Sequence, residues 1–344
     1  MFEITEKKKQ PEKATTDRKT VSNGIRRWIG GIFLTLAIAL LAMELVRWPV
    51  LSFTGPMLLS ILLGMTVRHF IPVITELQAG FAFSSKTLLR TGIVLLGLRL
   101  NLHQIAAAGV QILAIDMIVI AATFLFMWWL GKRLNVETKM RALISTGTAI
   151  CGAAAIVAVA PVLRAPAEKV ATAVAYIAIT GTVFAIGYSI FFVAFHPDPA
   201  LYGALVGSTL HEVAHVVAAG AVSGAAGADM AILVKLGRVL LLVPVVFLLL
   251  WIFKPATKNV PIPWFIFLFL GMSAFQTFIP ISAMWTEWGI QLSTLFLAMG
   301  MAGLGLGVNF STLKEGGRKM ATFSVLGTVG IVIVGIVSVL LGLS

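Results

Sequence analysis

Residues 211–215 read His-Glu-Val-Ala-His, which places two histidines and a glutamate within five positions. On a helix, this spacing puts two imidazoles one turn apart, where they bind zinc while the glutamate activates water. A catalytic zinc also needs a third protein ligand. No histidine follows His215, and the later acidic residues lie in predicted loops. Asp116 would supply the ligand only through an unfamiliar topology. The sequence therefore favours another role for the motif, with no catalytic residue, no bound metal and no cofactor.

The same stretch predicts a polar face inside an apolar segment. On a continuous helix, Ser208, His211, Glu212 and His215 would share one face by their i, i+3, i+4 and i+7 spacing. A carboxylate within a bilayer is costly and faces a partner or a watery cavity. In the structural interpretation, these residues form a buried polar cluster that holds neighbouring helices together. In the functional interpretation, His211, Glu212 and Asp116 couple ligand binding to protonation, because burial favours the neutral form of a carboxyl group.

A second candidate is the small-residue stretch STGTAICGAAAIVAVAPV at 145–162. Its members Gly147, Thr148, Cys151 and Gly152 would let helix backbones pack closely. Alternatively, they form a discontinuous helix whose free backbone N–H groups bind an anion. Cys151 is the single cysteine of the chain, which excludes internal disulfides and cysteine-based metal clusters.

Four basic residues lie within predicted spans: Arg90, Arg99, Lys235 and Arg238. Only two acidic residues, Asp116 and Glu212, lie at comparable depth. A positive surplus inside the membrane suits an anionic substrate, whereas snorkelling toward the interface is the alternative for Arg90.

The composition requires membrane-spanning elements to position these residues. Of the 344 residues, 59% are hydrophobic and only 12% are charged, and the mean hydropathy is +0.99. We therefore predict an all-α polytopic bundle of about 11 spans. The expected spans are Trp28–Val46, Val50–Val67, Ser84–Leu102, Ile105–Leu130, Ala142–Leu163, Lys169–Phe195, Leu201–Val222, Met230–Phe253, Trp264–Ile281, Gly289–Phe310 and Met320–Leu343.

The charge distribution predicts the orientation of the chain. Residues 1–27 carry eight of the 26 Lys and Arg residues, and we expect them to form a disordered cytoplasmic tail before the transporter domain at 28–344. Most other basic residues outside the spans lie on the same predicted side, which places the N-terminus in the cytoplasm and the C-terminus outside. The net charge of +12 is thus a signal of topology and does not indicate a nucleic-acid partner.

An internal repeat indicates the class of membrane protein. LLGLRLNLHQI at 95–105 aligns with GLGLGVNFSTL at 303–313, which pairs Asn101 with Asn309. The second and third spans thus correspond to the ninth and tenth, and an odd displacement makes the copies run in opposite directions. Inverted repeats are typical of secondary transporters. Chance similarity between Gly- and Leu-rich helices is the alternative.

Together, LLRTGIVLLGLRLNL, STGTAICGAAAIVAVAPV and GSTLHEVAHVVAAG resemble the YeiH-type sulfate exporter family of bacterial membrane proteins. The resemblance covers nearly all of the chain after the basic tail. It implies export of sulfate or an organosulfonate-like anion across the inner (plasma) membrane. More distantly, the chain resembles sodium/proton antiporters and bile-acid symporters, in which two broken helices cross at mid-membrane. The expected broken helices are the fifth span and the tenth, around Gly300–Gly307.

We expect a secondary transporter of a small inorganic or sulfonated anion. The expected substrate-binding residues are Gly147, Thr148, Cys151, Gly152, Arg99, Asn101, Ser208, Arg238, Lys235 and Asn309. An intramembrane zinc protease, an anion channel and a non-transporting sensor are the alternatives, although the short loops offer no output domain for a sensor. The sequence leaves the oligomeric state open, with a homodimer as one option.

Overall fold

The computed structural model describes residues 13–48, 51, 54–71, 76–100, 102–103, 110–253, 264–279, 281–307 and 310–342. Every regular element in these ranges is helical, as predicted. The elements are α1 (Lys13–Leu45), α2 (Gly55–Phe70), α3 (Gln78–Phe83), η2 (Ser84–Leu88), α4 (Leu89–Leu96), η3 (Gly97–Arg99), α6 (Val110–Arg133), α7 (Thr138–Ala149), α8 (Ala153–Val159), α9 (Ala167–Phe195), α10 (Pro199–Thr209), α11 (Val213–Ala221), α12 (Gly224–Leu240), α13 (Leu242–Phe253), α14 (Trp264–Phe278), α15 (Ala283–Leu306) and α16 (Phe310–Gly342).

Seven of the described helical stretches are long and apolar enough to cross a membrane, and α14 is a shorter apolar helix. The predicted number of about 11 spans is not confirmed. Two of the predicted spans, 142–163 and 201–222, are not single helices in the structure. Each is broken near its middle, and the chain turns back on itself.

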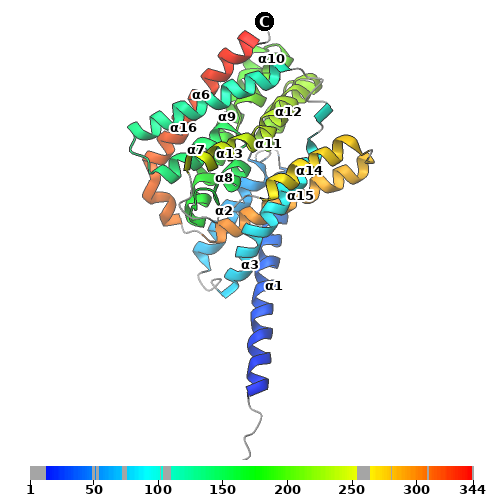
Figure 1. The fold of residues 1–344 in the computed structure, drawn as a ribbon, viewed down its shortest axis with the longest axis vertical. Helices are drawn as coiled ribbons and strands as arrows, with labels where there is room; N and C mark the ends of the chain where they lie inside the picture. Colours follow the sequence, from blue (N-terminus) through cyan, green and yellow to red (C-terminus); the bar gives the residue numbers. More distant parts are fainter. Residues whose placement is uncertain are drawn as a thin grey trace, which may run out of the picture.

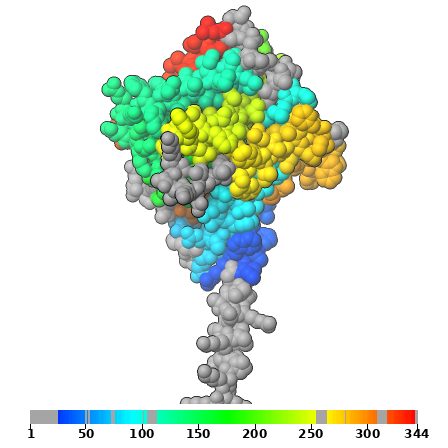
Figure 2. Space-filling view, viewed as in Figure 1, coloured from blue at the N-terminus to red at the C-terminus, as the bar shows by residue number. Residues whose placement is uncertain are grey.

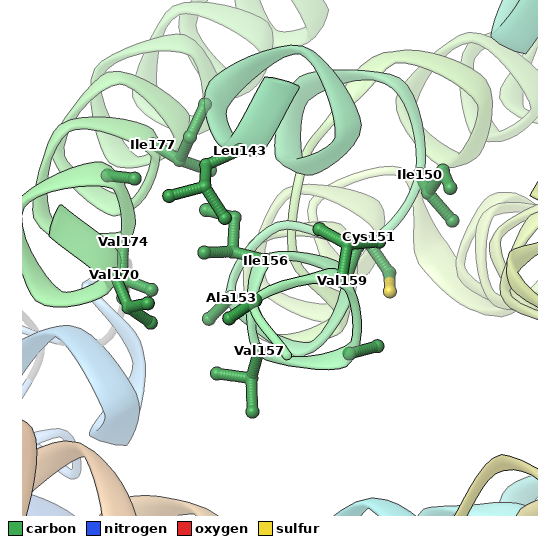
Figure 3. Packing of buried hydrophobic residues seen from close by; sticks show 14 of the residues in the cluster. Leu143, Ile150, Cys151, Ala153, Ile156, Val157, Val159, Val170, Val174 and Ile177 are labelled. Carbon is green, nitrogen blue, oxygen red and sulfur yellow. The ribbon is translucent and has the colours of Figure 1, made fainter. Parts of the chain in front are cut away.

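The first of these segments forms a hairpin of α7 and α8. Lys139 Nζ, at the start of α7, donates a hydrogen bond to the Arg164 carbonyl oxygen, 3.1 Å away. A straight helix would separate these residues by about 38 Å, so the chain must reverse between them. The reversal occurs at Gly152, whose φ of 66° is a conformation that glycine adopts readily. Apolar side chains of α7, α8 and α9 pack together, including Leu143, Ile156 and Ile177 (Figure 3).

The second hairpin consists of α10 and α11. Tyr202 Oη near the start of α10 donates to the Ala219 carbonyl near the end of α11, at 3.1 Å. The chain reverses at Leu210 and Glu212, whose backbones are extended. A discontinuous helix was predicted, and the first hairpin supplies one. The expected partner around Gly300–Gly307 was wrong: α15 is continuous to Leu306, and its glycines allow close packing against neighbouring helices.

The two hairpins enter the bundle from opposite ends. The open end of the first lies at the start of α9, where Lys169 pairs with Glu137, and α10 begins just after the end of α9. With 29 residues, α9 is about 44 Å long. The 12 residues of α7 and the 11 residues of α10 together span about 35 Å. The hairpin tips therefore meet near the middle of α9.

The remaining helices fall into two groups by their packing. The first group, here called the platform, comprises α1, α2, α3, η2, α4, η3, α14 and α15. The second, called the core group, contains both hairpins with α6, α9, α12, α13 and α16. Figure 1 shows α1 and α3 at the lower end of the bundle and α10 with the C-terminal part of α16 at the upper end.

The two platform helices that carry the predicted repeat run in opposite directions. Gly92 lies against Leu297, whereas Leu98, further along its helix, lies against Gly289. Increasing residue numbers on one helix meet decreasing numbers on the other, so the third and tenth predicted spans are antiparallel. The hairpins, which enter from opposite ends, extend this inverted arrangement to the core group.

The N-terminal segment differs from the prediction of a disordered tail over 1–27. Helix α1 begins at Lys13, so residues 13–27 continue the helix of the first span, while residues 1–12 lie outside the described residues. The physical reason is that helix propagation from an existing helix is far easier than nucleation. Figure 1 shows this part of α1 projecting from the bundle.

The outer surface of the bundle is apolar, as a bilayer requires. On the face seen in Figure 2, α6 and α13 lie side by side next to α14. A groove of about 620 Å³ between α6 and α13 is lined by apolar side chains, among them Phe124, Trp128 and Leu248. Such a surface suits contact with lipid acyl chains.

Candidate functional site

The hairpin tips touch at Gly152 and Glu212. A Cβ atom at Gly152 would lie 2.7 Å from the Glu212 Cγ, so only glycine fits at this contact. Glu212 directly precedes α11 and is 2% exposed. Among the described residues, no side chain hydrogen-bonds its carboxylate oxygens and no cation forms an ion pair with them; its hydrogen-bonding neighbour is the backbone of Ala153, at the start of α8. Because a buried carboxylate without a cationic partner is energetically costly, this position indicates a functional demand.

Lys235 on α12 links the two hairpin tips on the side away from the cavity described below. Its Nζ donates to the carbonyl oxygens of Ile150 at 2.7 Å and Leu210 at 2.6 Å. These residues follow directly after α7 and α10, so the ammonium caps the C-terminal ends of two half-helices. Lys235 is fully buried and does not line the cavity described below.

Arg238, one turn further along α12, pairs with Asp116 of α6. The Arg238 Nε lies 3.4 Å from Asp116 Oδ1, and both side chains are fully buried. Arg238 was predicted to bind substrate and Asp116 to couple protonation. The structure places both away from the cavity, in an ion pair that joins α12 to α6.

The two histidines contact α9 and α16. His211 Nε2 lies 3.1 Å from the Thr328 hydroxyl, and His215 Nε2 lies 3.1 Å from the Thr182 hydroxyl. Both rings pack against Gly181, where a Cβ atom would meet His215 Nδ1 at 2.6 Å. Because the helix begins only at Val213, the helical spacing that a zinc-binding His-Glu-x-x-His requires is absent. The prediction that Ser208, His211, Glu212 and His215 share one helical face is wrong for the same reason.

Ser208, Gly147 and Thr148 occupy packing positions within the hairpins. The Ser208 hydroxyl donates to the Leu205 carbonyl of its own helix, and Gly147 lies against Ile156. The Thr148 hydroxyl is buried and makes no hydrogen bond to the described residues. Asn101 and Asn309 lie outside the described residues.

A cavity of about 460 Å³ lies between the platform and the core group. Its lining includes Cys151 at the first tip and Glu212 at the second, and Arg99 contributes from the platform. It follows α11 from Glu212 to Ala221, a distance of about 14 Å. Of the predicted site residues, Arg99, Cys151 and Glu212 line it.

The cavity combines two sources of positive charge with a mainly apolar lining. The N-terminus of α11 begins at its wall, and a helix N-terminus carries partial positive charge. Arg99 adds a full positive charge, and Glu287 is an acidic neighbour but not an ion-pair partner within 4 Å. Most of the remaining lining is apolar, including Met57, Leu96 and Val217.

Sequence reasoning missed the second hairpin and the capping role of Lys235. The signal for the hairpin was present in residues 207–212, where Gly, Ser and Thr precede the two ionisable residues. Hydropathy cannot reveal a reversal, because it measures the length of an apolar segment and not its direction.

Comparison with known proteins agrees with the motif resemblance. Residues 30–324 match the family described as Conserved hypothetical protein 698. A UPF0324 membrane protein of Bacillus cereus is 43% identical over 317 residues, covering 90% of each chain. A UPF0324 membrane protein of Listeria monocytogenes is 38% identical over 317 residues, covering 90% of this chain and 95% of its own. One from Staphylococcus aureus is 35% identical over 295 residues, covering 84% and 89%. No solved structure matches. The chain is therefore a membrane protein of the UPF0324 family, the YeiH-type family that its motifs resemble.

Proposed function

We propose that the protein is a secondary transporter that moves a small anion across the bacterial inner (plasma) membrane by alternating access. The observation that carries this proposal is the cavity between two helix groups, with a buried carboxylate that has no ion-pair partner among the described residues and an arginine on opposite walls. A site at the boundary between two groups changes its exposure when one group moves against the other. Few contacts join the groups, compared with the packing inside each.

The charge pattern supports an assignment of the two sides. Lys132, Arg133, Lys139, Arg164 and Lys169 lie near the open end of the first hairpin. Lys319 joins them through the Asn135 carbonyl. By the positive-inside rule this end faces the cytoplasm. The cavity extends from the tips toward the opposite end, because Val46 and Ala221 line it. In this assignment, the described conformation is open to the outside.

The lining favours a sulfonated organic anion over inorganic sulfate. Sulfate carries two negative charges, whereas the wall offers one arginine, one helix N-terminus and an acidic residue. The apolar lining would contact an organic group, which sulfate lacks.

We propose that Glu212 links binding to a proton. An ionised Glu212 would repel an anion at short range in a medium of low dielectric constant. Lys235, Cys151, His211 and Arg238 surround the hairpin tips, but none forms an ion pair with Glu212. Protonation of Glu212 on binding would remove the repulsion.

Equilibrium binding of sulfate and of alkyl sulfonates to the purified protein between pH 5.5 and 8.5 tests the proposal. We expect sulfonate binding that weakens as the pH rises, and Glu212→Gln should bind without this pH dependence. Arg99→Gln should weaken binding by about tenfold or more. Arg90→Gln is the matched control, because Arg90 lies over the Phe265 ring, outside the cavity lining. Absence of binding and flux for every anion would refute the proposed function. A flat pH profile in the wild type would refute the role of Glu212 alone.

A further inference from the structure

The junction behind the hairpin tips has the geometry of a cation site that is occupied by a side chain. Lys235 Nζ lies within 2.7 Å of two main-chain carbonyl oxygens, those of Ile150 and Leu210. Both residues are the C-terminal caps of half-helices, and their carbonyls point out of the ends of α7 and α10. In membrane transporters, unwound carbonyls at half-helix ends are where sodium ions or protons bind.

The charges at this junction balance. Each helix C-terminus carries the equivalent of about half a negative charge, so two of them together present about one. A single ammonium group compensates this charge. The side chain is 0% exposed, as are its neighbours Asp116 and Arg238, which neutralise each other as an ion pair. Water therefore does not screen the helix ends, and a cation at the carbonyls is the local means of stabilising them.

We propose that Lys235 is a built-in monovalent cation that holds the two hairpin tips together, so that the protein requires no dissolved sodium ion at this junction. Lys235 acts as a positioning residue. It fixes the tips so that Glu212 and the N-terminus of α11 face the cavity from the other side. The consequence for coupling, that transport does not depend on sodium, rests on the proposed function, whereas the consequence for stability does not.

Two substitutions of Lys235 separate charge from packing. Lys235→Ala removes the charge and leaves room for a small cation. Lys235→Met removes the charge but fills most of the space with an apolar chain of similar length. Lys169→Ala is the surface control, because Lys169 pairs with Glu137 at the open end of the first hairpin.

The experiment measures the melting temperature of each purified protein in sodium, ammonium, methylammonium and choline chloride at equal ionic strength. We expect the wild type and Lys169→Ala to show no difference between these cations. Both Lys235 variants should melt at least about 5 °C lower in choline. In Lys235→Ala alone, one or more of the small cations should restore at least half of that loss.

Three results would overturn the proposal. The first is a wild type that is stabilised by sodium relative to choline, and the second is a Lys235→Ala variant whose loss no cation restores. The third is an unchanged melting temperature in both variants. If neither variant accumulates as folded protein, the wild-type comparison still decides: sodium dependence of its stability or of anion flux contradicts a built-in cation. Absence of all anion flux would refute the proposed function and leave the stability result standing.

Discussion

The contact between the hairpin tips allows a quantitative test through Gly152→Ala. Gly152 has a φ of 66° and a ψ of −125°, a region that costs a residue with a side chain about 1–3 kcal/mol. The new methyl group would also lie 2.7 Å from the Glu212 Cγ, and such overpacking costs about 1–3 kcal/mol. The sum is about 2–6 kcal/mol, less whatever the tips recover by moving apart. We therefore expect both lower stability and a displaced Glu212.

The assay is thermal unfolding of purified protein with and without a bound sulfonate, beside an anion-binding titration. Gly187→Ala on α9 is the matched control, because a Cβ atom there meets no atom within 4 Å. Gly152→Ala should lower the melting temperature by roughly 4 °C or more and weaken anion binding, whereas Gly187→Ala should do neither. Equal stability and equal binding in the two variants would show that the tips do not meet as described.

Three further outcomes follow from the same geometry. Single cysteines introduced at Lys139 and Lys169 in a Cys151→Ala background should both react with an impermeant reagent from one side of the membrane, and one at Asp198 from the other. Labelling of the first two positions from opposite sides would show that residues 142–163 cross the membrane and do not form a hairpin. His215→Gln should leave anion binding largely intact, and the purified wild type should contain much less than one zinc per chain by elemental analysis. Stoichiometric zinc in the wild type that is lost in the variant would refute the interpretation that residues 211–215 do not bind zinc. Asp116→Asn should destabilise the protein by about 3–5 kcal/mol, since it leaves a buried arginine without its counter-ion. A chemical denaturation curve that matches the wild type would contradict the ion pair.

Several features of the protein follow from the sequence alone. The apolar composition is incompatible with a soluble surface and requires helices that satisfy their own backbone hydrogen bonds in a bilayer. Local motifs also identified the family, and they singled out Arg99, Cys151 and Glu212, which line one cavity in the structure, because ionisable and small residues are conspicuous against an apolar background. The sequence also predicted that the third and tenth spans run in opposite directions, and their helices pack antiparallel in the structure.

Only the tertiary structure decided the direction of the chain and the partners of the buried charges. Residues 142–163 and 201–222 are long and apolar enough to span, and their hydropathy is the same whether they cross or turn back. The reversals depend on contacts between distant segments: Lys235 with Ile150 and Leu210, and Gly152 with Glu212. Likewise, the spacing of Lys235 and Arg238 predicts a shared face but not what that face meets. Long-range packing places Lys235 at the ends of α7 and α10 and pairs Arg238 with Asp116. It leaves Arg99 and Glu212 in the lining of the cavity.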